Sequence, residues 1–321
     1  MRMPAANSYQ PDMLGPDFEQ LILPQPADYE GPVQSTLVRR RATQPGRRAV
    51  LYVHGFNDYF FQQEMAAQYQ QHGYRFYALD LRKYGRSWLP HQQPNHVRNL
   101  REYYADLDDA LTVMQAEGHD QIVLSGHSTG GLVTALYCQD GRNRGAVSAL
   151  FLNSPFLAMH QSWVNRHVGV PLAAAAGRFA PDLKLPAMLP SVYGESLHQQ
   201  YRGEWDYYLP WKPLDIFPVT LGWLRAIHAG HQRVRRGLAI AVPVLVLHSQ
   251  QTAAGKGWND EFFRADIVLN VRDIRTLAPR LGERVTVQAI AGGLHDLVLS
   301  APAVRAQVYR TLFAWLATTL G

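Results

Sequence analysis

Cysteine and long apolar runs are both scarce in this chain. Cys138 is the single cysteine among 321 residues, which excludes an intramolecular disulfide and fits a reducing compartment. The longest nearly unbroken apolar stretch, residues 238–247, is interrupted by Pro243 and is about half as long as a bilayer span requires. The first seven residues lack the apolar core of a signal peptide. These absences predict a cytoplasmic protein without an integral membrane segment.

Strong charge is absent too, because 31 basic residues stand against 26 acidic ones and leave a net charge of +5. The basic clusters at residues 39–41, 47–48 and 233–236 are dispersed, and no aromatic residues are interleaved with them. A nucleic-acid surface gathers its basic residues on one face or stripe, so we expect no nucleic-acid partner. The sequence does not indicate an oligomeric state.

What the chain does contain is an alternation of short apolar runs with segments of helical periodicity. Nearly continuous apolar strands that alternate with helices are typical of a parallel sheet covered on both faces, which predicts the α/β class with a mostly parallel central sheet flanked by helices. Residues 33–41 predict an edge strand, and residues 1 to about 30 an irregular lead-in. The other expected strands are 49–53, 74–79, 122–125, 147–152, 242–247 and 285–290, and the expected helices are 60–72, 100–117, 128–139, about 265–281 and 302–319.

One long segment breaks the alternation. Residues 155–238 are rich in proline, tryptophan and tyrosine and hold no clear strand. A structureless loop of that length is implausible in a compact domain. We therefore expect a helical cap over residues 155–238, inserted into a core domain made of residues 1–154 and 239–321.

The pentapeptide Gly-His-Ser-Thr-Gly at residues 126–130 follows an expected strand and opens an expected helix. A serine in such a strand-to-helix turn projects its hydroxyl from the end of the sheet, and the flanking glycines avoid clashes there. Ser128 is therefore the candidate nucleophile. His127 is expected to point into the fold and to be structural, and Cys138 to be a buried core residue.

A serine nucleophile needs a base to take its proton, and the base needs a carboxylate to orient it. His295 stands out among the 13 histidines because its loop follows the strand 285–290 and returns to the strand end that carries Ser128. Asp260, Glu261 and Asp266 all follow the strand 242–247. Asp266 is favoured because apolar residues follow it directly, and Asp260 remains the alternative.

The tetrahedral intermediate of acyl transfer needs two hydrogen-bond donors. One is expected from the backbone N–H of Thr129, the residue after the nucleophile, and the other from Phe56 in the loop after the strand 49–53. His54 and Gly55 are expected to shape that loop. This chemistry requires no metal and no organic cofactor.

These pieces, together with Asp80–Ser87, make the sequence resemble the α/β-hydrolase superfamily, and within it the monoacylglycerol lipase, lysophospholipase and serine aminopeptidase-like branch. The matching pieces run from about residue 49 to 296. Lys83 stands where the element D-x-R-G-x-G-x-S of that branch usually has its first glycine. Residues 250–264 replace the short G-x-x-D turn that usually supplies the acid, and Thr129 stands where methionine or leucine is commoner.

The resemblance implies an α/β-hydrolase fold with a cap and a serine hydrolase that cleaves a small-molecule ester, such as a monoacylglycerol, a lysophospholipid or another small acyl ester. Thioester and amide hydrolysis use the same machinery and remain alternatives, although the proline-iminopeptidase signature is missing around Ser128. Dehalogenase and epoxide hydrolase chemistry need a carboxylate in place of Ser128 and are disfavoured. A non-catalytic binding protein on the same fold is the alternative of another class.

Overall fold

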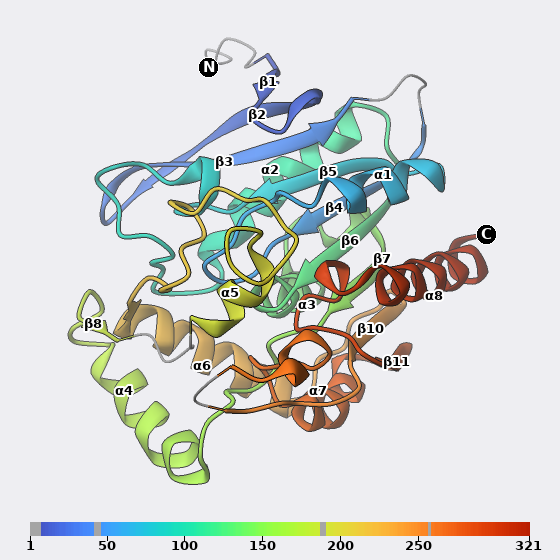
Figure 1. Ribbon diagram of the computed structural model, residues 1–321. Helices are drawn as coiled ribbons and strands as arrows, with labels where there is room; N and C mark the ends of the chain where they lie inside the picture. Colours follow the sequence, from blue (N-terminus) through green and yellow to red (C-terminus); the bar gives the residue numbers. More distant parts are fainter. Residues whose placement is uncertain (1–7, 42–45, 187–190, 256–257) are drawn as a thin grey trace.

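The computed structural model describes residues 8–41, 46–186, 191–255 and 258–321. In this part of the chain the centre is a nine-stranded sheet in the order β1-β2-β3-β5-β4-β6-β7-β10-β11 (Figure 1). Three antiparallel strands form one side of the sheet: β1 (Gln10–Asp12), β2 (Gly15–Asp28) and β3 (Gly31–Arg40). The remaining six are parallel: β5 (Arg75–Asp80), β4 (Arg48–Val53), β6 (Gln121–His127), β7 (Val147–Asn153), β10 (Val244–Ser249) and β11 (Val285–Ile290).

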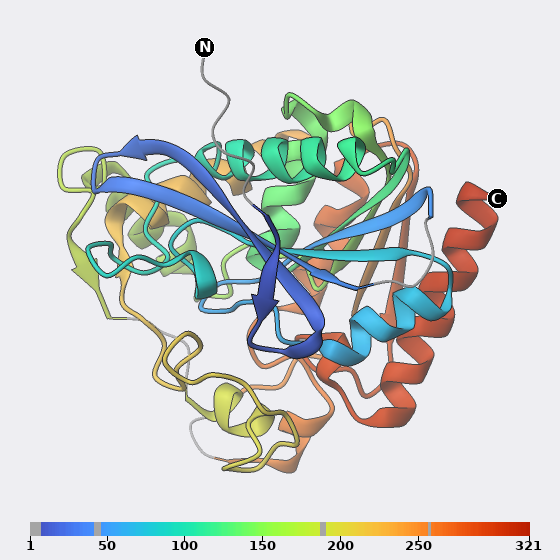
Figure 2. The ribbon, with the colours of Figure 1, turned by 90° about the horizontal axis from the view of Figure 1, so that it is seen from above.

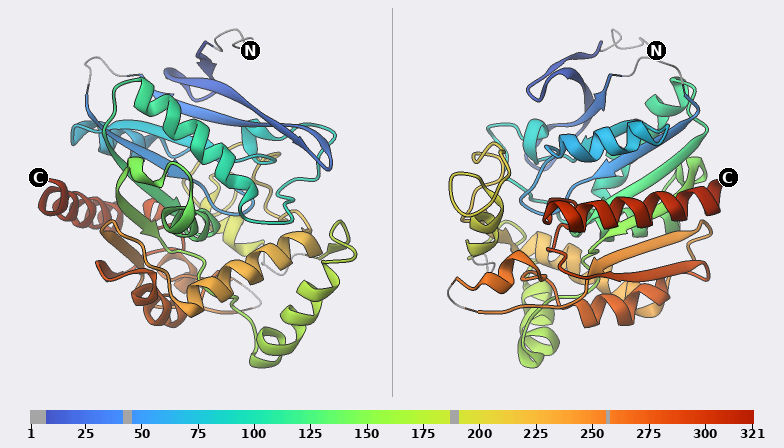
Figure 3. Two further views of the ribbon diagram at one scale, coloured as in Figure 1. Left: turned by 180° about the vertical axis from the view of Figure 1, so that it is seen from behind. Right: turned by 45° about the vertical axis from the view of Figure 1, so that its right-hand side comes forward.

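Helices cover both faces of the sheet. Figure 3 shows α1 (Gln63–Gln71) and α8 (Pro302–Leu320) on one face and α2 (Glu102–Ala116) and α3 (Thr129–Asp140) on the other. Neighbouring residues of a central strand enter different apolar clusters, as with Val50 beside α1 and Leu51 beside α2. Because both faces are buried, the strand reads as one apolar run, and the expected sheet flanked by helices is confirmed. Among the described helices, none is both long and apolar enough to cross a bilayer.

The expectation of an irregular lead-in over residues 1–30 is wrong from β1 onward, and residues 1–7 lie outside the described part. Figure 2 shows β2 and β3 as a long twisted ribbon across the molecule. Phe18 of β2 enters the apolar cluster beside α1, and Leu21 and Leu23 enter the cluster beside α2. Pro24 and Pro26 lie beyond the pairing with β1, on the outer edge of β2, where a missing N–H donor costs nothing.

The edge position predicted for residues 33–41 is also wrong. Strand β3 pairs with β2 on one side and with β5 on the other, so it lies inside the sheet. Its weak alternation misled the prediction because Ser35 and Thr36 are fully buried polar residues. Thr36 accepts a hydrogen bond from the Ser87 hydroxyl at 3.1 Å, which allows a polar side chain at an interior position.

The segment between β7 and β10 is mainly helix and loop and gathers at one side of the sheet (Figure 1). A π-helical turn, Asn165–Gly169, leads into α4 (Val170–Ala176), and α5 (Val192–Leu197) and α6 (Leu221–Arg236) follow. The expectation of no strand is wrong in detail, because β8 (Lys184–Leu185) pairs antiparallel with β9 (Val219–Thr220). A pair of two-residue strands is too short to leave a periodic signal in the sequence.

Two of the expected helices begin later in the structure than the sequence predicts. Helix α1 begins at Gln63 rather than at residue 60, and α7 (Val271–Leu277) begins after Asn270, whose side chain accepts from the Arg272 N–H. The helix expected from about residue 265 therefore starts later, and Asp266 lies in the preceding loop. Single 3-10 turns are η1 (Gly85–Ser87), η2 (Arg144–Ala146), η4 (Asp260–Phe263), η5 (Ala278–Leu281) and η6 (Leu297–Leu299).

Cys138 lies on α3 with 7% of its surface exposed, which confirms the expectation of a buried core residue. Burial raises the pKa of its thiol to about 12, because a thiolate would have to form away from water. The side chain therefore packs as a small apolar group.

A pH dependence of stability is expected from His231 on α6, a buried residue whose Nε2 donates to the Phe156 carbonyl at 2.9 Å. Burial lowers its pKa from 6.5 to about 3. Below pH 6.5 the unfolded chain binds a proton at His231, whereas the folded chain keeps this side chain neutral until the pH nears 3. The contribution of neutral His231 to the free energy of unfolding is therefore complete above pH 6.5 and declines as the pH falls toward 3. Urea unfolding of wild type and His231→Gln, which can keep the hydrogen bond, measures this effect. Between pH 7 and pH 5 we expect wild type to lose about 2 kcal/mol more than the variant, and equal losses would contradict this assignment.

Candidate active site

Ser128 occupies a sharp turn between β6 and α3. Its backbone has φ 51° and ψ −116°, a positive-φ conformation that residues with a side chain rarely adopt. The turn places the hydroxyl at the carboxyl end of β6, the side of a parallel sheet where ligands bind.

The glycines around Ser128 are required by close backbone contacts. A Cβ atom on Gly130 would lie 2.2 Å from the His54 carbonyl oxygen, and one on Gly126 would lie 2.4 Å from Thr134 Oγ1. These distances are far below van der Waals contact, so any side chain at either position would displace the turn. The two glycines thus allow the close packing that holds Ser128 in the turn between β6 and α3.

The loop after β11 brings His295 to Ser128, with 3.0 Å between Nε2 and Oγ. The next residue anchors that loop, because the Asp296 carboxylate accepts from Asn153 Nδ2 at 2.7 Å and from Gln62 Nε2 at 3.3 Å. Both Ser128 and His295 are buried. The structure therefore holds these two predicted site residues at hydrogen-bond distance.

Asp266 completes a hydrogen-bonded chain, with 2.9 Å between its Oδ2 and His295 Nδ1. Its other oxygen, Oδ1, accepts the N–H groups of Val268 at 2.8 Å and Leu269 at 2.7 Å. Asp266 is fully buried. Asp260, the alternative acid, is exposed in η4 and accepts from the Trp258 indole instead. The structure brings Asp266, and not Asp260, to His295.

These contacts favour one tautomer of His295. With its proton on Nδ1, His295 donates to Asp266 and leaves the Nε2 lone pair to accept the Ser128 hydroxyl proton. The carboxylate holds this tautomer and stabilises the imidazolium once it forms. The arrangement can therefore make an oxygen nucleophile from Ser128.

The two expected oxyanion donors lie around Ser128. Thr129 is the first residue of α3, and the loop that carries Phe56 approaches so closely that a Cβ on Gly55 would lie 3.2 Å from Ser128 Cβ. Within the described residues, neither the Phe56 N–H nor the Thr129 N–H donates to another group of the chain. Both donors are available to a ligand. His54 shapes this loop, because its Nε2 accepts the Leu81 N–H at 3.1 Å.

Residues 80–87 support the loop that follows β4. The Asp80 carboxylate accepts the Phe60 N–H at 2.9 Å and pairs with Arg86 at 2.8 Å. Lys83 adopts φ 65°, the left-handed conformation for which glycine is the usual residue. Its buried ammonium pairs with Asp28 and Glu30 at 2.6 Å each, and these two ion pairs hold the lysine in that conformation.

A cavity of about 500 Å³ opens over Ser128 and is lined by both core and insertion residues. Most of its wall is apolar, including Met159, Val170 and Trp223. A polar corner next to His295 was missed by the sequence analysis: its members are Asp58, His127, Tyr193 and Lys212. Asp58 and Lys212 form an ion pair of 2.7 Å, and no local pattern signals it because 154 residues separate them.

His127 is buried as expected, and Nδ1 lies 3.2 Å from the Asn153 carbonyl. Among the described residues, His127, Asp58 and Asp296 form the one group of side chains whose atoms lie close enough to share a metal ion. Asp58 is already paired with Lys212, and Asp296 accepts two amide donors. Burial lowers the pKa of His127, which keeps its ring neutral. The group is suited to internal hydrogen bonding, and we assign it no metal.

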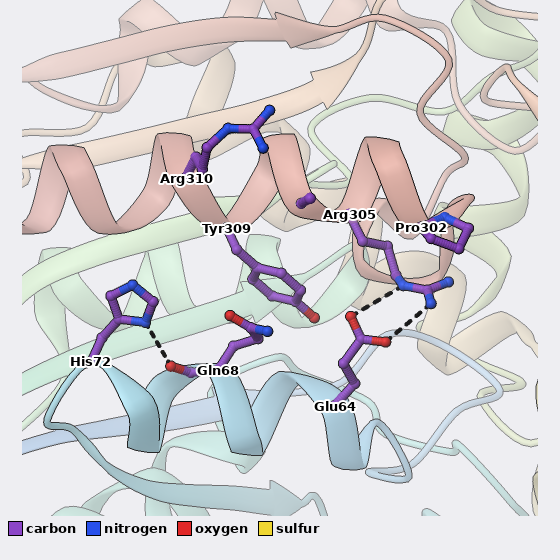
Figure 4. A pocket seen from close by; sticks show the side chains of 8 residues that line it. Glu64, Gln68, His72, Pro302, Arg305, Tyr309 and Arg310 are labelled. Atoms are coloured by element: carbon purple, nitrogen blue, oxygen red, sulfur yellow. Dashed lines mark hydrogen bonds and ion pairs between the residues drawn. The ribbon is translucent and has the colours of Figure 1, made fainter.

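A second cavity of about 260 Å³ lies between α1 and α8 (Figure 4). Its charged groups satisfy each other, because Arg305 pairs with Glu64 at 3.1 Å and also with Glu204. His72 bonds within its own helix, to the Gln68 carbonyl at 2.8 Å. With no nucleophile beside a base, this cavity is not a candidate catalytic site.

Comparisons with known proteins show the family of this chain. A sequence model of the family described as serine aminopeptidase, S33, matches residues 44–300. The monoglyceride lipase of Saccharomyces cerevisiae is 23% identical over 244 residues, which cover 71% of this chain and 74% of that enzyme. Epoxide hydrolase 4 of Mus musculus matches locally, at 33% identity over 95 residues, 30% of this chain and 25% of that protein.

Solved structures show the same fold. The crystal structure of a soluble variant of the Saccharomyces cerevisiae lipase with a substrate analog superposes with a TM-score of 0.69 at 16% identity, covering 93% of this chain and 96% of that one. The monoacylglycerol lipase of Paleococcus ferrophilus gives a TM-score of 0.65 at 20% identity, covering 88% and 99%. These two structures thus share the overall fold over most of this chain.

Proposed function

The chain belongs to the serine aminopeptidase S33 family and has the α/β-hydrolase fold, and from this premise we propose that it is a serine hydrolase of carboxylic esters with Ser128, His295 and Asp266 as its triad. The observation that carries the proposal is the hydrogen-bonded chain Oγ–Nε2 of 3.0 Å and Nδ1–Oδ2 of 2.9 Å at the floor of the main cavity. That chain joins three sequence-distant residues in the order that acyl transfer requires.

The reaction proceeds in two halves. Ser128 Oγ attacks the ester carbonyl while His295 Nε2 takes its proton, and the N–H groups of Phe56 and Thr129 bind the oxyanion. His295 then gives the proton to the leaving alcohol, and the carbonyl carbon stays bonded to Ser128 as an acyl-enzyme. A water molecule, deprotonated by His295, attacks this ester. His295 then returns that proton to Ser128 Oγ as the bond to the acyl carbon breaks, which releases the carboxylic acid and restores Ser128.

The cavity supports an acyl substrate of moderate size. Its apolar wall suits a hydrocarbon chain, and its polar corner beside His295 suits the alcohol part of a monoacylglycerol, a lysophospholipid or another small ester. We propose that residues 155–238 act as the cap that closes this cavity over a core of residues 1–154 and 239–321, because Met159, Val170 and Trp223 of that segment line it. Thioesters and amides present the same carbonyl, and they are the alternative substrates.

Hydrolysis of p-nitrophenyl esters from acetate to palmitate tests the proposal, with a thioester and an aminoacyl p-nitroanilide measured alongside. We expect ester hydrolysis with an optimum chain length that reflects the cavity, and labelling of Ser128 by a fluorophosphonate probe. Faster turnover of the thioester or anilide would move the assignment to that substrate class. A protein that hydrolyses none of them and leaves Ser128 unlabelled would be a binding protein on a hydrolase fold.

A further inference from the structure

The three residues that follow Phe56 all bind the same segment of the insertion, residues 207–217. Asn57 Nδ2 donates to the Pro213 carbonyl at 3.1 Å, and Asn57 Oδ1 accepts the Phe217 N–H at 3.2 Å. The Tyr59 hydroxyl accepts the Tyr208 N–H at 2.6 Å. Between them, Asp58 accepts from Lys212. A loop of the core is therefore bound, residue by residue, to the insertion.

Both the backbone conformation and the hydrogen bonds of Asn57 suit an asparagine at this position. It is 4% exposed and has φ 53°, a left-handed conformation that asparagine tolerates better than most residues. Its side chain bonds both ends of a turn in the insertion, at Pro213 and Phe217. The conformation of the core loop and the course of the insertion are thus determined together.

The Asp58–Lys212 pair is equally enclosed, with 2% and 8% of the residue surfaces exposed. The Lys212 ammonium also lies 5.8 Å from the ring centre of Phe61 and 5.6 Å from that of Tyr207. Burial opposes ionisation of Asp58, but the Lys212 ammonium and the neighbouring His127 and His54 together outweigh it, and the pKa of the carboxyl is lowered. The two charges therefore stay paired at neutral pH and hold the loop at short range.

The two oxyanion donors differ in what holds them. Neither N–H makes a hydrogen bond within the described chain, but Thr129 is the first residue of α3 of the core, whereas Phe56 lies in a loop. The Phe56 ring packs on Trp223 of α6, with 4.6 Å between ring centres, and the residues after it bind residues 207–217. The insertion thus supports Phe56 from both its side chain and its C-terminal neighbours.

We infer that Asn57 and Lys212 are positioning residues, through which residues 207–217 of the insertion hold the Phe56 N–H at the place of the developing oxyanion. The inference rests on the proposed function, since it concerns the same hydrolytic step. It makes the oxyanion site a joint product of the core and the insertion: Thr129 supplies the core donor, and the insertion aligns the other donor.

Two variants test the inference by independent routes. Asn57→Gly removes both hydrogen bonds of the side chain while glycine keeps the left-handed conformation accessible. Asp58→Asn with Lys212→Met removes the ion pair without leaving a buried charge alone. The control is Asp182→Asn, because Asp182 joins the insertion to His96 and Arg98 of the core at 2.9 and 2.8 Å and does not line the cavity.

For each variant, kcat and KM of a p-nitrophenyl ester are measured per active site titrated with the fluorophosphonate. We expect kcat to fall roughly tenfold to a hundredfold for the two test variants with little change in KM, because a misaligned donor weakens transition-state binding only. Asp182→Asn is expected to keep the wild-type kcat. The rate ratio of an ester to its thionoester gives a second readout, since sulfur accepts hydrogen bonds poorly and the ratio falls when a donor is lost.

The outcomes separate this inference from the proposed function. If wild type neither hydrolyses esters nor is labelled at Ser128, the proposed function fails and the inference falls with it. If wild type is active and the variants keep kcat per titrated site, with losses only in folded fraction, the inference alone is overturned. A rise in KM at constant kcat would also overturn it, because Lys212 would then bind substrate instead of positioning Phe56.

Discussion

Ser128→Ala is expected to lower kcat for ester hydrolysis by roughly 10⁵-fold or more, because removal of a triad serine abolishes covalent catalysis. Folding should be unaffected. Alanine has the same Cβ as serine and bears the same strain at φ 51°, and the hydrogen bond lost is the one from Oγ to His295. The measurement is kcat for the best p-nitrophenyl ester, together with the unfolding midpoint in urea.

Ser154→Ala is the matched control. Ser154 is also buried, has φ 46° and follows a parallel strand of the same sheet, β7. Within the described residues its hydroxyl makes no hydrogen bond, and therefore none to the proposed triad. We expect kcat of this variant within about threefold of wild type, as for a substitution that removes no catalytic interaction. Retention of activity in Ser128→Ala would remove Ser128 from the mechanism.

The parts of the site that could be predicted from the sequence are those whose geometry depends on neighbouring residues. The turn at Ser128 needs glycine at positions 126 and 130 because backbone atoms lie within 3 Å of any added Cβ. That requirement concerns five consecutive residues, so the turn can be predicted from a single sequence. His295 was predictable for a related reason, because the loop after β11 must start at the carboxyl ends of the parallel strands, where Ser128 lies.

The parts that could not be predicted depend on contacts between distant residues. Strand β2 is stabilised by pairing with β3, and its prolines are harmless only because of where β1 ends. The bonds from Asn57 and Asp58 to residues 207–217 cross about 155 positions of the chain. Neither arrangement changes the local periodicity, so no pattern within one segment could indicate it.

Asp266 is intermediate, since its position after β10 was predictable but its choice over Asp260 depended on burial. The structure adds a reason that the sequence could not supply. Oδ1 of Asp266 accepts the N–H groups of Val268 and Leu269, so the atom at this place has to be a hydrogen-bond acceptor. One oxygen of the carboxylate is thus committed to the backbone and the other to His295.

Because the two oxygens of Asp266 have different partners, Asp266→Asn is the most informative substitution of the acid. The asparagine carbonyl must take the Oδ1 place, because two backbone donors point there, so its NH₂ group faces His295 Nδ1. His295 then has to accept at Nδ1 and carry its proton on Nε2, where it can no longer take the proton of Ser128. We expect kcat to fall by roughly 10³- to 10⁴-fold with little loss of stability, the size of effect that a wrong tautomer has in a serine triad.

Asp260→Asn is the companion measurement, because Asp260 follows the same strand and differs in being exposed and bound to Trp258. We expect kcat for that variant within about twofold of wild type. Equal losses in the two variants would point to a general effect of charge after β10, and a larger loss in Asp260→Asn would transfer the role of the acid to Asp260. The contacts of Asp266 require that kcat falls strongly in Asp266→Asn alone, with Ser128 still folded into its turn. Reversal of the single hydrogen bond at His295 Nδ1 is enough to leave Ser128 without a base.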